Sequence, residues 1–270
     1  MLRVLASFLF AFIETLRLRR ERGPARPTWS LRFESLVRYL RRDWEATRTW
    51  DLPRLRAELD RRPYPNPVGR KTKCRDADLG GVPARWVVPP AAREERFIIF
   101  FHGGSFIYGS GRTTHAEVIA RLAIACGVTV IAPDYRLAPE HPFPAQLEDA
   151  ERVYAALVAS GVSPKHIVLS GDSAGGNLAL ELALSLRDRG TPGPAGLVLV
   201  SPWSDLEMPG KSFVDNDRYD YGTREVLAVH ARAFAGGAAL DDPRLSPVHA
   251  RLDGIGPVLV IAGELEIPRD

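Results

Sequence analysis

Residues 170–177, SGDSAGGN, place a serine between two glycines in the pattern G-x-S-x-G. A serine hydroxyl is a weak nucleophile at neutral pH and needs an adjacent base, usually a histidine that a carboxylate orients. The neighbouring residues predict a buried strand over 167–169 and a helix that starts at residue 174. A sharp strand-to-helix turn exposes such a hydroxyl, so Ser173 is predicted to be a nucleophile. The alternative is a glycine-rich turn whose serine caps the helix.

A second pair of glycines follows the apolar run 97–101, in the sequence HGGSF that begins at His102. Glycines at the end of a strand can direct backbone N–H groups into a cavity, where they stabilise a developing oxyanion. We therefore expect the N–H groups of Gly103, Gly104 and Ala174, the residue after the nucleophile, to form an oxyanion hole. His102 could be the base, but at the head of this loop it is expected to brace the turn.

The composition is that of a folded protein with no obvious cofactor or nucleic-acid site. The 270 residues are 45% hydrophobic and 26% charged, which suits one large α/β domain and excludes disorder. Residues 1–75 hold 19 basic and 8 acidic residues, whereas residues 76–270 hold 17 and 25. The arginines lie between apolar residues without a nucleic-acid-binding signature, so no nucleic-acid partner is expected. The two cysteines, Cys74 and Cys126, match no metal-ligand spacing and indicate a reducing, cytoplasmic location.

The N-terminus combines an apolar run with arginines. Residues 4–13 form about ten apolar positions, too few to span a bilayer, and no signal-peptide cleavage site follows them. A helix packed on its own domain is the preferred interpretation. The alternative is an interfacial helix on an anionic membrane, which would make residues 1–22 a peripheral membrane contact.

The rest of the chain divides into a helical part and an alternating part. Residues 1–62 are predicted to be helical, and Pro63, Pro65 and Pro67 then mark a boundary to a second domain over 63–270. There, apolar runs alternate with helical stretches, which predicts a mostly parallel sheet with helices on both faces. The runs are 85–88, 97–101, 128–132, 167–169, 197–200 and 258–261, and the helices are 116–125, 146–159, 174–187 and 224–234.

Three motifs in register resemble those of a known family. They are HGGSFIYGS over 102–110, DYRLAPEHPFPAQLED over 134–149 and GDSAGG over 171–176. In this order and spacing they are similar to the hormone-sensitive-lipase-like branch of the α/β-hydrolases, which contains many bacterial carboxylesterases. The resemblance covers about residues 75–270. It implies an α/β-hydrolase fold under an N-terminal helical cap, and serine-dependent hydrolysis of short to medium acyl esters through an acyl-enzyme, without metal or cofactor.

The resemblance also assigns roles to single residues. Ser173 matches the nucleophile, and the three N–H groups named above match the oxyanion hole. Ser105 stands where many relatives have a third glycine, which changes little if the first two glycines supply the donors. The residues expected to support the loops are His102, Asp134, Tyr135, Arg136 and His141.

The acid and the base of the triad are harder to place. In the family, the acid follows the next-to-last strand, and here the run 258–261 is followed by AGELEIPRD, which puts Glu266 in that position. A shifted register would select Glu264 or Asp270 instead. The family's histidine comes after the acid, but all six histidines of this chain precede Glu266. We therefore expect a C-terminally incomplete hydrolase that lacks its last helix-strand-helix unit and leaves strand 258–261 with an unpaired edge.

Three alternatives stay open at this point. Ser173, Asp205 and His249 run in the order of a triad, although His249 precedes the strand 258–261. A ligand-binding protein is the second, since plant gibberellin receptors resemble this family and lack its histidine. The third is an inactive hydrolase fragment that acts at a membrane through residues 1–22.

Overall fold

The computed structural model describes residues 2–62 and 64–270 and divides the chain into two compact units. The first comprises Met1–Pro63, Gly210–Val226 and Glu264–Asp270, and the second comprises Tyr64–Pro209 and Leu227–Gly263. The sequence had placed residues 210–226 and 264–270 in the second domain. They belong to the first unit because they bond to it and to each other: Arg41 pairs with Asp217 at 3.0 Å, for example.

The second unit is built on a seven-stranded, mostly parallel sheet with the order β1-β2-β4-β3-β5-β6-β7. β1 and β2 are antiparallel, and β2 also runs antiparallel to β4, whereas every other neighbouring pair is parallel. The strands are β1 (Lys73–Leu79), β2 (Val82–Val88), β3 (Arg93–Phe101), β4 (Val128–Pro133), β5 (Ile167–Asp172), β6 (Gly196–Val200) and β7 (Val258–Ile261).

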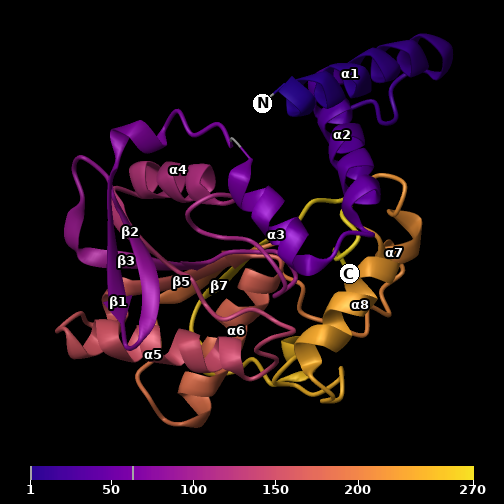
Figure 1. The fold of residues 1–270 in the computed structure, drawn as a ribbon. Coiled ribbons are helices and arrows are strands. Elements are labelled where there is room, and N and C mark those ends of the chain that lie inside the picture. Colours follow the sequence, from indigo (N-terminus) through magenta and orange to yellow (C-terminus); the bar gives the residue numbers. More distant parts are fainter. Residues whose placement is uncertain (1, 63) are drawn as a thin grey trace. The chain divides into compact units, whose positions relative to one another are not determined.

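Helices cover both faces of this sheet, as the alternating pattern predicts. α4 (Ala116–Cys126) lies on one face, and α5 (Ala145–Ala159) and α6 (Ala174–Asp188) lie on the other (Figure 1). All six residues of β4 are buried, because this inner strand is covered on both faces of the sheet and meets no water.

The helical elements that follow β6 in the chain are α7 (Ser212–Asp215), α8 (Arg224–Ala235) and the short 3₁₀ turn η3 (Pro247–His249). Two further 3₁₀ turns occur earlier in the chain, η1 (Gly69–Lys71) and η2 (Pro164–His166).

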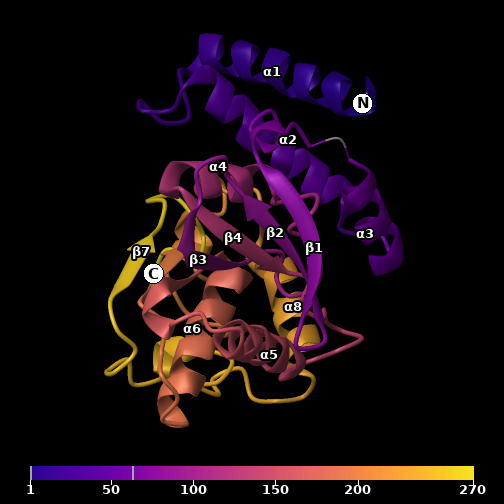
Figure 2. The same ribbon diagram turned by 90° about the vertical axis from the view of Figure 1, so that its left-hand side faces the viewer.

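The first unit contains α1 (Leu2–Arg22), α2 (Leu31–Thr47) and α3 (Leu52–Arg61), visible in Figure 2. α2 begins directly after Ser30, whose side chain caps the helix by accepting a hydrogen bond from the N–H of Phe33. α1 packs on α2, and Arg19 of α1 pairs with the buried Glu34 of α2 at 2.7 Å.

The outer face of α1 is apolar and exposed. Leu5, Leu9, Phe10 and Ile13 are each 55–59% exposed, while Ala11 on the opposite side is buried. None of the helices in the described residues is long and apolar enough to cross a bilayer.

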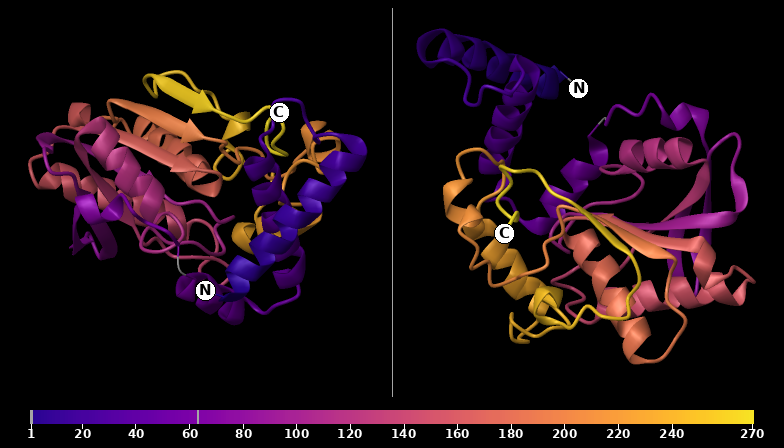
Figure 3. Two further views of the ribbon diagram at one scale, coloured as in Figure 1. Left: turned by 90° about the horizontal axis from the view of Figure 1, so that it is seen from above. Right: turned by 180° about the vertical axis from the view of Figure 1, so that it is seen from behind.

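β7 is the outermost strand on its side of the sheet, as Figure 3 shows. Among the described residues it pairs with β6 alone, and its four residues are 42–55% exposed. This strand therefore presents an apolar, unpaired edge.

Candidate active site

Ser173 lies in a strained turn between β5 and α6. Its backbone φ is +51° and its ψ is −121°, a conformation that residues with a side chain rarely adopt. The turn is held from the next strand, because the N–H of Ser173 donates to the carbonyl of Val200 at 2.9 Å. The Ser173 carbonyl in turn accepts from the N–H of Trp203 at 3.0 Å. The arrangement is the strand-turn-helix that the sequence predicts around the serine.

The glycines on either side of Ser173 are required by space. A Cβ on Gly175 would overlap the carbonyl oxygen of Phe101, the last residue of β3. A Cβ on Gly171 would overlap the backbone of Gly175 and lie 2.6 Å from the same Phe101 oxygen. β3, β5 and α6 therefore meet at van der Waals contact beneath the serine, which only glycine permits.

The loop after β3 turns back on itself. Gly104 has φ +120°, and its carbonyl accepts from the N–H groups of Ile107 at 2.9 Å and Tyr108 at 3.1 Å. Ser105 also has a positive φ, of 56°. Across residues 2–62 and 64–270, no hydrogen bond of the structure uses the N–H of Gly104, Ser105 or Ala174. These three amides have no hydrogen-bond partner among the described residues.

Gly103 differs from the sequence expectation. Its N–H donates to the Asp172 carboxylate, with 3.0 Å between N and Oδ1. An N–H that donates to a carboxylate is not directed at an oxyanion, so Gly103 has a partner where an oxyanion donor should have none. The sequence could not show this, because the bond joins residues 69 positions apart.

His102 is buried and braces the loop. Its ring stacks on Tyr135 with centroids 4.4 Å apart, and Nδ1 donates to the carbonyl of Gly103 at 2.8 Å. The hydroxyl of Tyr135 donates to the carbonyl of His102 at 2.6 Å. Burial lowers the pKa of His102 to about 4, so the ring is neutral at pH 7. This geometry is that of a structural histidine.

Asp134 and Arg136 belong to ion-pair networks. Arg112 donates to the Asp134 carboxylate at 2.7 Å, and Arg136 donates to Asp149 at 3.0 Å and to Glu148 at 2.8 Å. Burial raises the pKa of Asp149, but the hydrogen bonds from Arg136 outweigh it, so the pKa lies below its ordinary value. These bonds join Arg136, near the beginning of the DYRLAPEHPFPAQLED segment, to Glu148 and Asp149 at its end, which lie in α5.

Glu266 lies in the first compact unit. Its carbonyl accepts from the side-chain amide of Asn216 at 2.9 Å, and its side chain is partly buried. Asp270, one of the alternatives, uses its carboxylate locally: it accepts from the N–H of Ser212 at 2.7 Å and from Arg269 at 2.6 Å. The assignment of Glu266 as the triad acid stays a prediction.

In the part of the chain that the structure describes, no histidine is hydrogen bonded to the Ser173 hydroxyl. The sequence reasoning missed His115, which donates from Nε2 to Oδ2 of Asp172 at 3.2 Å. No local signal indicates this contact, because the two residues are 57 positions apart.

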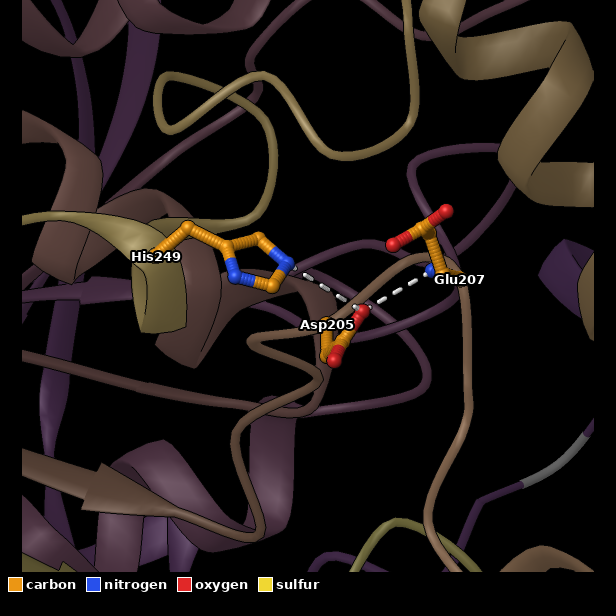
Figure 4. A group of neighbouring side chains, drawn as sticks. All are labelled: Asp205, Glu207 and His249. Atoms are coloured by element: carbon orange, nitrogen blue, oxygen red, sulfur yellow. Dashed lines mark hydrogen bonds and ion pairs between the residues drawn. The ribbon is translucent and has the colours of Figure 1, made fainter.

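Asp205 and His249, the alternative dyad, do lie together (Figure 4). His249 Nε2 is 3.9 Å from Asp205 Oδ1, which already accepts from the N–H of Glu207 at 3.0 Å. Asp205, Glu207 and His249 each offer one ligand atom within 4.8 Å of the others, but Glu207 and His249 are exposed. Exposed groups of this kind are common without a metal ion, and the described hydrogen bonds connect none of the three to the Ser173 hydroxyl.

Comparison with known proteins identifies the fold. Residues 98–270 match the family described as alpha/beta hydrolase fold. An acetyl-hydrolase of Streptomyces hygroscopicus is 38% identical over 197 residues, which are 71% of this chain and 64% of that protein. An esterase of Acinetobacter venetianus is 36% identical over 219 residues, or 80% of this chain and 71% of that protein. Another relative, from Mycobacterium tuberculosis, is matched over 61% of its length, so the chain spans less than two thirds of some of its curated relatives.

Comparison with solved structures identifies the same fold. The crystal structure of an esterase/lipase from an uncultured bacterium matches with a TM-score of 0.78 and 29% sequence identity. The matched region is 96% of this chain and 80% of that protein's chain. That of a hormone-sensitive lipase from a metagenome library has a TM-score of 0.80 and 33% identity, with coverages of 87% and 79%. The chain belongs to the α/β-hydrolase family. The resemblance to its hormone-sensitive-lipase-like branch is confirmed.

Proposed function

We propose that the protein is a serine carboxylic-ester hydrolase that works through an acyl-enzyme. The observation that supports this most is Ser173 at its strained turn, beside three backbone N–H groups that have no partner among the described residues. The named relatives, an acetyl-hydrolase and an esterase, support the same reaction class.

In this reaction Ser173 Oγ attacks the carbonyl carbon of the ester, and the carbonyl oxygen becomes an oxyanion. Backbone N–H groups of Gly104, Ser105 and Ala174 donate to it, where the low dielectric of a partly buried site makes such bonds strong. The histidine base takes the hydroxyl proton as Ser173 attacks and gives it to the leaving alkoxide when the intermediate collapses, which releases the alcohol and leaves Ser173 acylated. Attack by water then releases the acid and restores the hydroxyl.

The role of Gly103 in this mechanism is revised from the sequence expectation. Because its N–H is bound to Asp172, we assign it to the support of the loop and assign its place in the oxyanion hole to Ser105. Both Ser105 and Gly104 have positive φ angles, so the backbone turns at the two residues that would supply the donors.

The proposed triad acid is Glu266, which would accept a hydrogen bond from the imidazole N–H of the histidine base. The proposed substrates are esters of short to medium acyl chains. The name of the Streptomyces relative, an acetyl-hydrolase, favours the short end of this range. No step of the mechanism requires a metal or a cofactor.

We also propose that α1 makes a peripheral contact with anionic lipid. Its exposed apolar face, which includes Leu5, Leu9 and Ile13, is followed by six arginines and one glutamate in residues 17–32. An apolar helix face beside a basic segment is the pattern of interfacial helices.

Ester hydrolysis by the full-length protein tests the proposed enzyme activity. Ser173→Ala should lower kcat on p-nitrophenyl acetate and butyrate by at least about 10³-fold, because it removes the nucleophile. Ser185→Ala, which removes a serine of α6 that bonds to Glu151, is the matched control and should keep the wild-type rate. Equal rates for wild type and Ser173→Ala would refute the proposal.

A further inference from the structure

Asp172 joins three segments that converge on the nucleophile. It is the last residue of β5 and the residue directly before Ser173. One carboxylate oxygen accepts from the N–H of Gly103, at 3.0 Å, and the other accepts from Nε2 of His115, at 3.2 Å. A single side chain thus connects the end of β5, the loop after β3 and the start of α4.

The register of the sheet explains why this connection forms. Phe101 of β3 pairs with Gly171 of β5, so the two strands leave the sheet at the same level. Two residues later they reach Gly103 and Ser173. The residue before Ser173 therefore stands opposite the start of the glycine loop, within hydrogen-bonding distance of its backbone.

The fit around the carboxylate is tight. A Cβ on Gly103 would overlap Oδ2 of Asp172 and lie 3.0 Å from the Asp172 carbonyl oxygen. Glycine at position 103 therefore lets the carboxylate approach the amide, a role different from that of a hole donor. On the far side, the His115 ring is held by Thr114, whose Oγ1 is 2.8 Å from Nδ1.

The negative charge of Asp172 has to be offset by hydrogen-bond donors, and His115 supplies one of them. A carboxylate beside an oxyanion hole repels the negative charge that develops there. Burial raises the pKa of Asp172, but the hydrogen bonds from His115 and from the Gly103 N–H outweigh this effect, so the pKa lies below its ordinary value. Two hydrogen-bond donors thus compensate the charge of Asp172.

We propose that Asp172 and His115 are positioning residues for ester hydrolysis, acting through Gly103 to hold the loop so that the N–H groups of Gly104 and Ser105 face the oxyanion. This rests on the proposed function. Neither side chain touches the substrate in this scheme. Their effect should fall on the transition state, where the oxyanion exists, and so on kcat rather than KM.

The kinetic test compares variants of the full-length protein. Asp172→Ala should lower kcat for p-nitrophenyl acetate by about 10- to 100-fold, the usual cost of losing a supporting hydrogen bond, with KM within about twofold. Asp172→Asn keeps an acceptor for the Gly103 N–H and should recover most of that loss. His115→Ala should lower kcat too, and the double variant Asp172→Ala/His115→Ala should be no slower than Asp172→Ala alone, since both act through one carboxylate.

Asp149→Asn is the matched control. Asp149 is also a paired, low-pKa carboxylate of the second unit, but its partners are Arg136 and Arg152. This variant should lower the melting temperature and leave kcat per folded molecule unchanged. If Asp149→Asn lowers kcat as much as Asp172→Ala, or if Asp172→Asn is as slow as Asp172→Ala, the positioning role is refuted.

Amide hydrogen exchange separates this proposal from the proposed function. In the 270-residue chain, Asp172→Ala should speed exchange in the peptide over residues 102–108, while Asp149→Asn should not. Unchanged exchange in that peptide would overturn the proposal even if the protein is an esterase. If the wild type hydrolyses no ester, the proposed function fails, and the exchange result alone then decides whether Asp172 holds the loop.

Discussion

The backbone N–H of Ser173 donates to the carbonyl of Val200 at 2.9 Å, so the end of β6 fixes the turn between β5 and α6. This bond, with the close approach of Gly175 to β3, holds Ser173 at φ +51°. The protein therefore stores backbone strain at Ser173, the proposed nucleophile.

The strain predicts a stability difference between two substitutions of Ser173. Ser173→Gly should be more stable than Ser173→Ala by about 1–2 kcal/mol, because glycine adopts positive φ freely whereas alanine keeps a strained Cβ. Both variants lack the hydroxyl, so the hydroxyl cannot cause the difference. Urea unfolding of the two proteins measures it. Equal stability, or a more stable Ser173→Ala, would show that the turn is not strained.

Burial of His102 predicts a pH dependence of stability. The unfolded chain protonates this histidine near pH 6.5, whereas the folded protein does so only near its lowered pKa of about 4. The unfolded state therefore binds more protons between these values, and the stability that neutral His102 contributes is lost as the pH falls through this window, by about 3 kcal/mol in total.

The measurement compares wild type with His102→Gln, which does not titrate. Urea unfolding at pH 7 and pH 4.5 should show a larger loss of stability for the wild type than for the variant, whatever the other groups contribute. Equal losses for both proteins would mean that His102 is not buried as a neutral ring.

The apolar face of α1 predicts binding to anionic vesicles. The protein should co-sediment with phosphatidylserine-containing vesicles at low salt and less at high salt, because arginines supply part of the attraction. Leu9→Asp/Ile13→Asp should abolish binding, while Val118→Asp, at an exposed position of α4, should not. Binding that survives the α1 substitutions would refute the lipid contact.

The edge of β7 predicts self-association of the 270-residue chain. Val258, Leu259, Val260 and Ile261 are exposed on an unpaired strand. Leu259→Lys should reduce concentration-dependent association in sedimentation velocity, since a charge on an edge strand opposes pairing. Leu252→Lys, at a leucine of similar exposure outside the strands, is the control. A wild type that stays monomeric at high concentration would contradict the prediction.

Local patterns predicted much of the fold and the strand-turn-helix around Ser173. The alternation of apolar runs and helical stretches indicated the parallel sheet, and the glycines around Ser173 indicated the turn, because both signals lie within a few residues of each other. β1 was missed: its residues, KCRDADL, are mostly exposed and show no apolar run, so it forms through pairing with β2.

Contacts between distant residues could not be predicted in the same way. The bond from Gly103 to Asp172 changes the interpretation of the glycine loop, and the bond from His115 to Asp172 adds a residue that no motif indicates. Likewise, residues 210–226 and 264–270 join the first compact unit through contacts that carry no sequence pattern.

The most direct test of the central claim is to locate the covalent adduct that a reactive phosphonate ester forms with the full-length protein. Peptide mass spectrometry should find one phosphonyl group per chain, on the peptide that contains Ser173, with a parallel loss of p-nitrophenyl ester hydrolysis. An adduct on another residue, or hydrolysis that persists after Ser173 is fully modified, would contradict the assignment of Ser173 as the nucleophile.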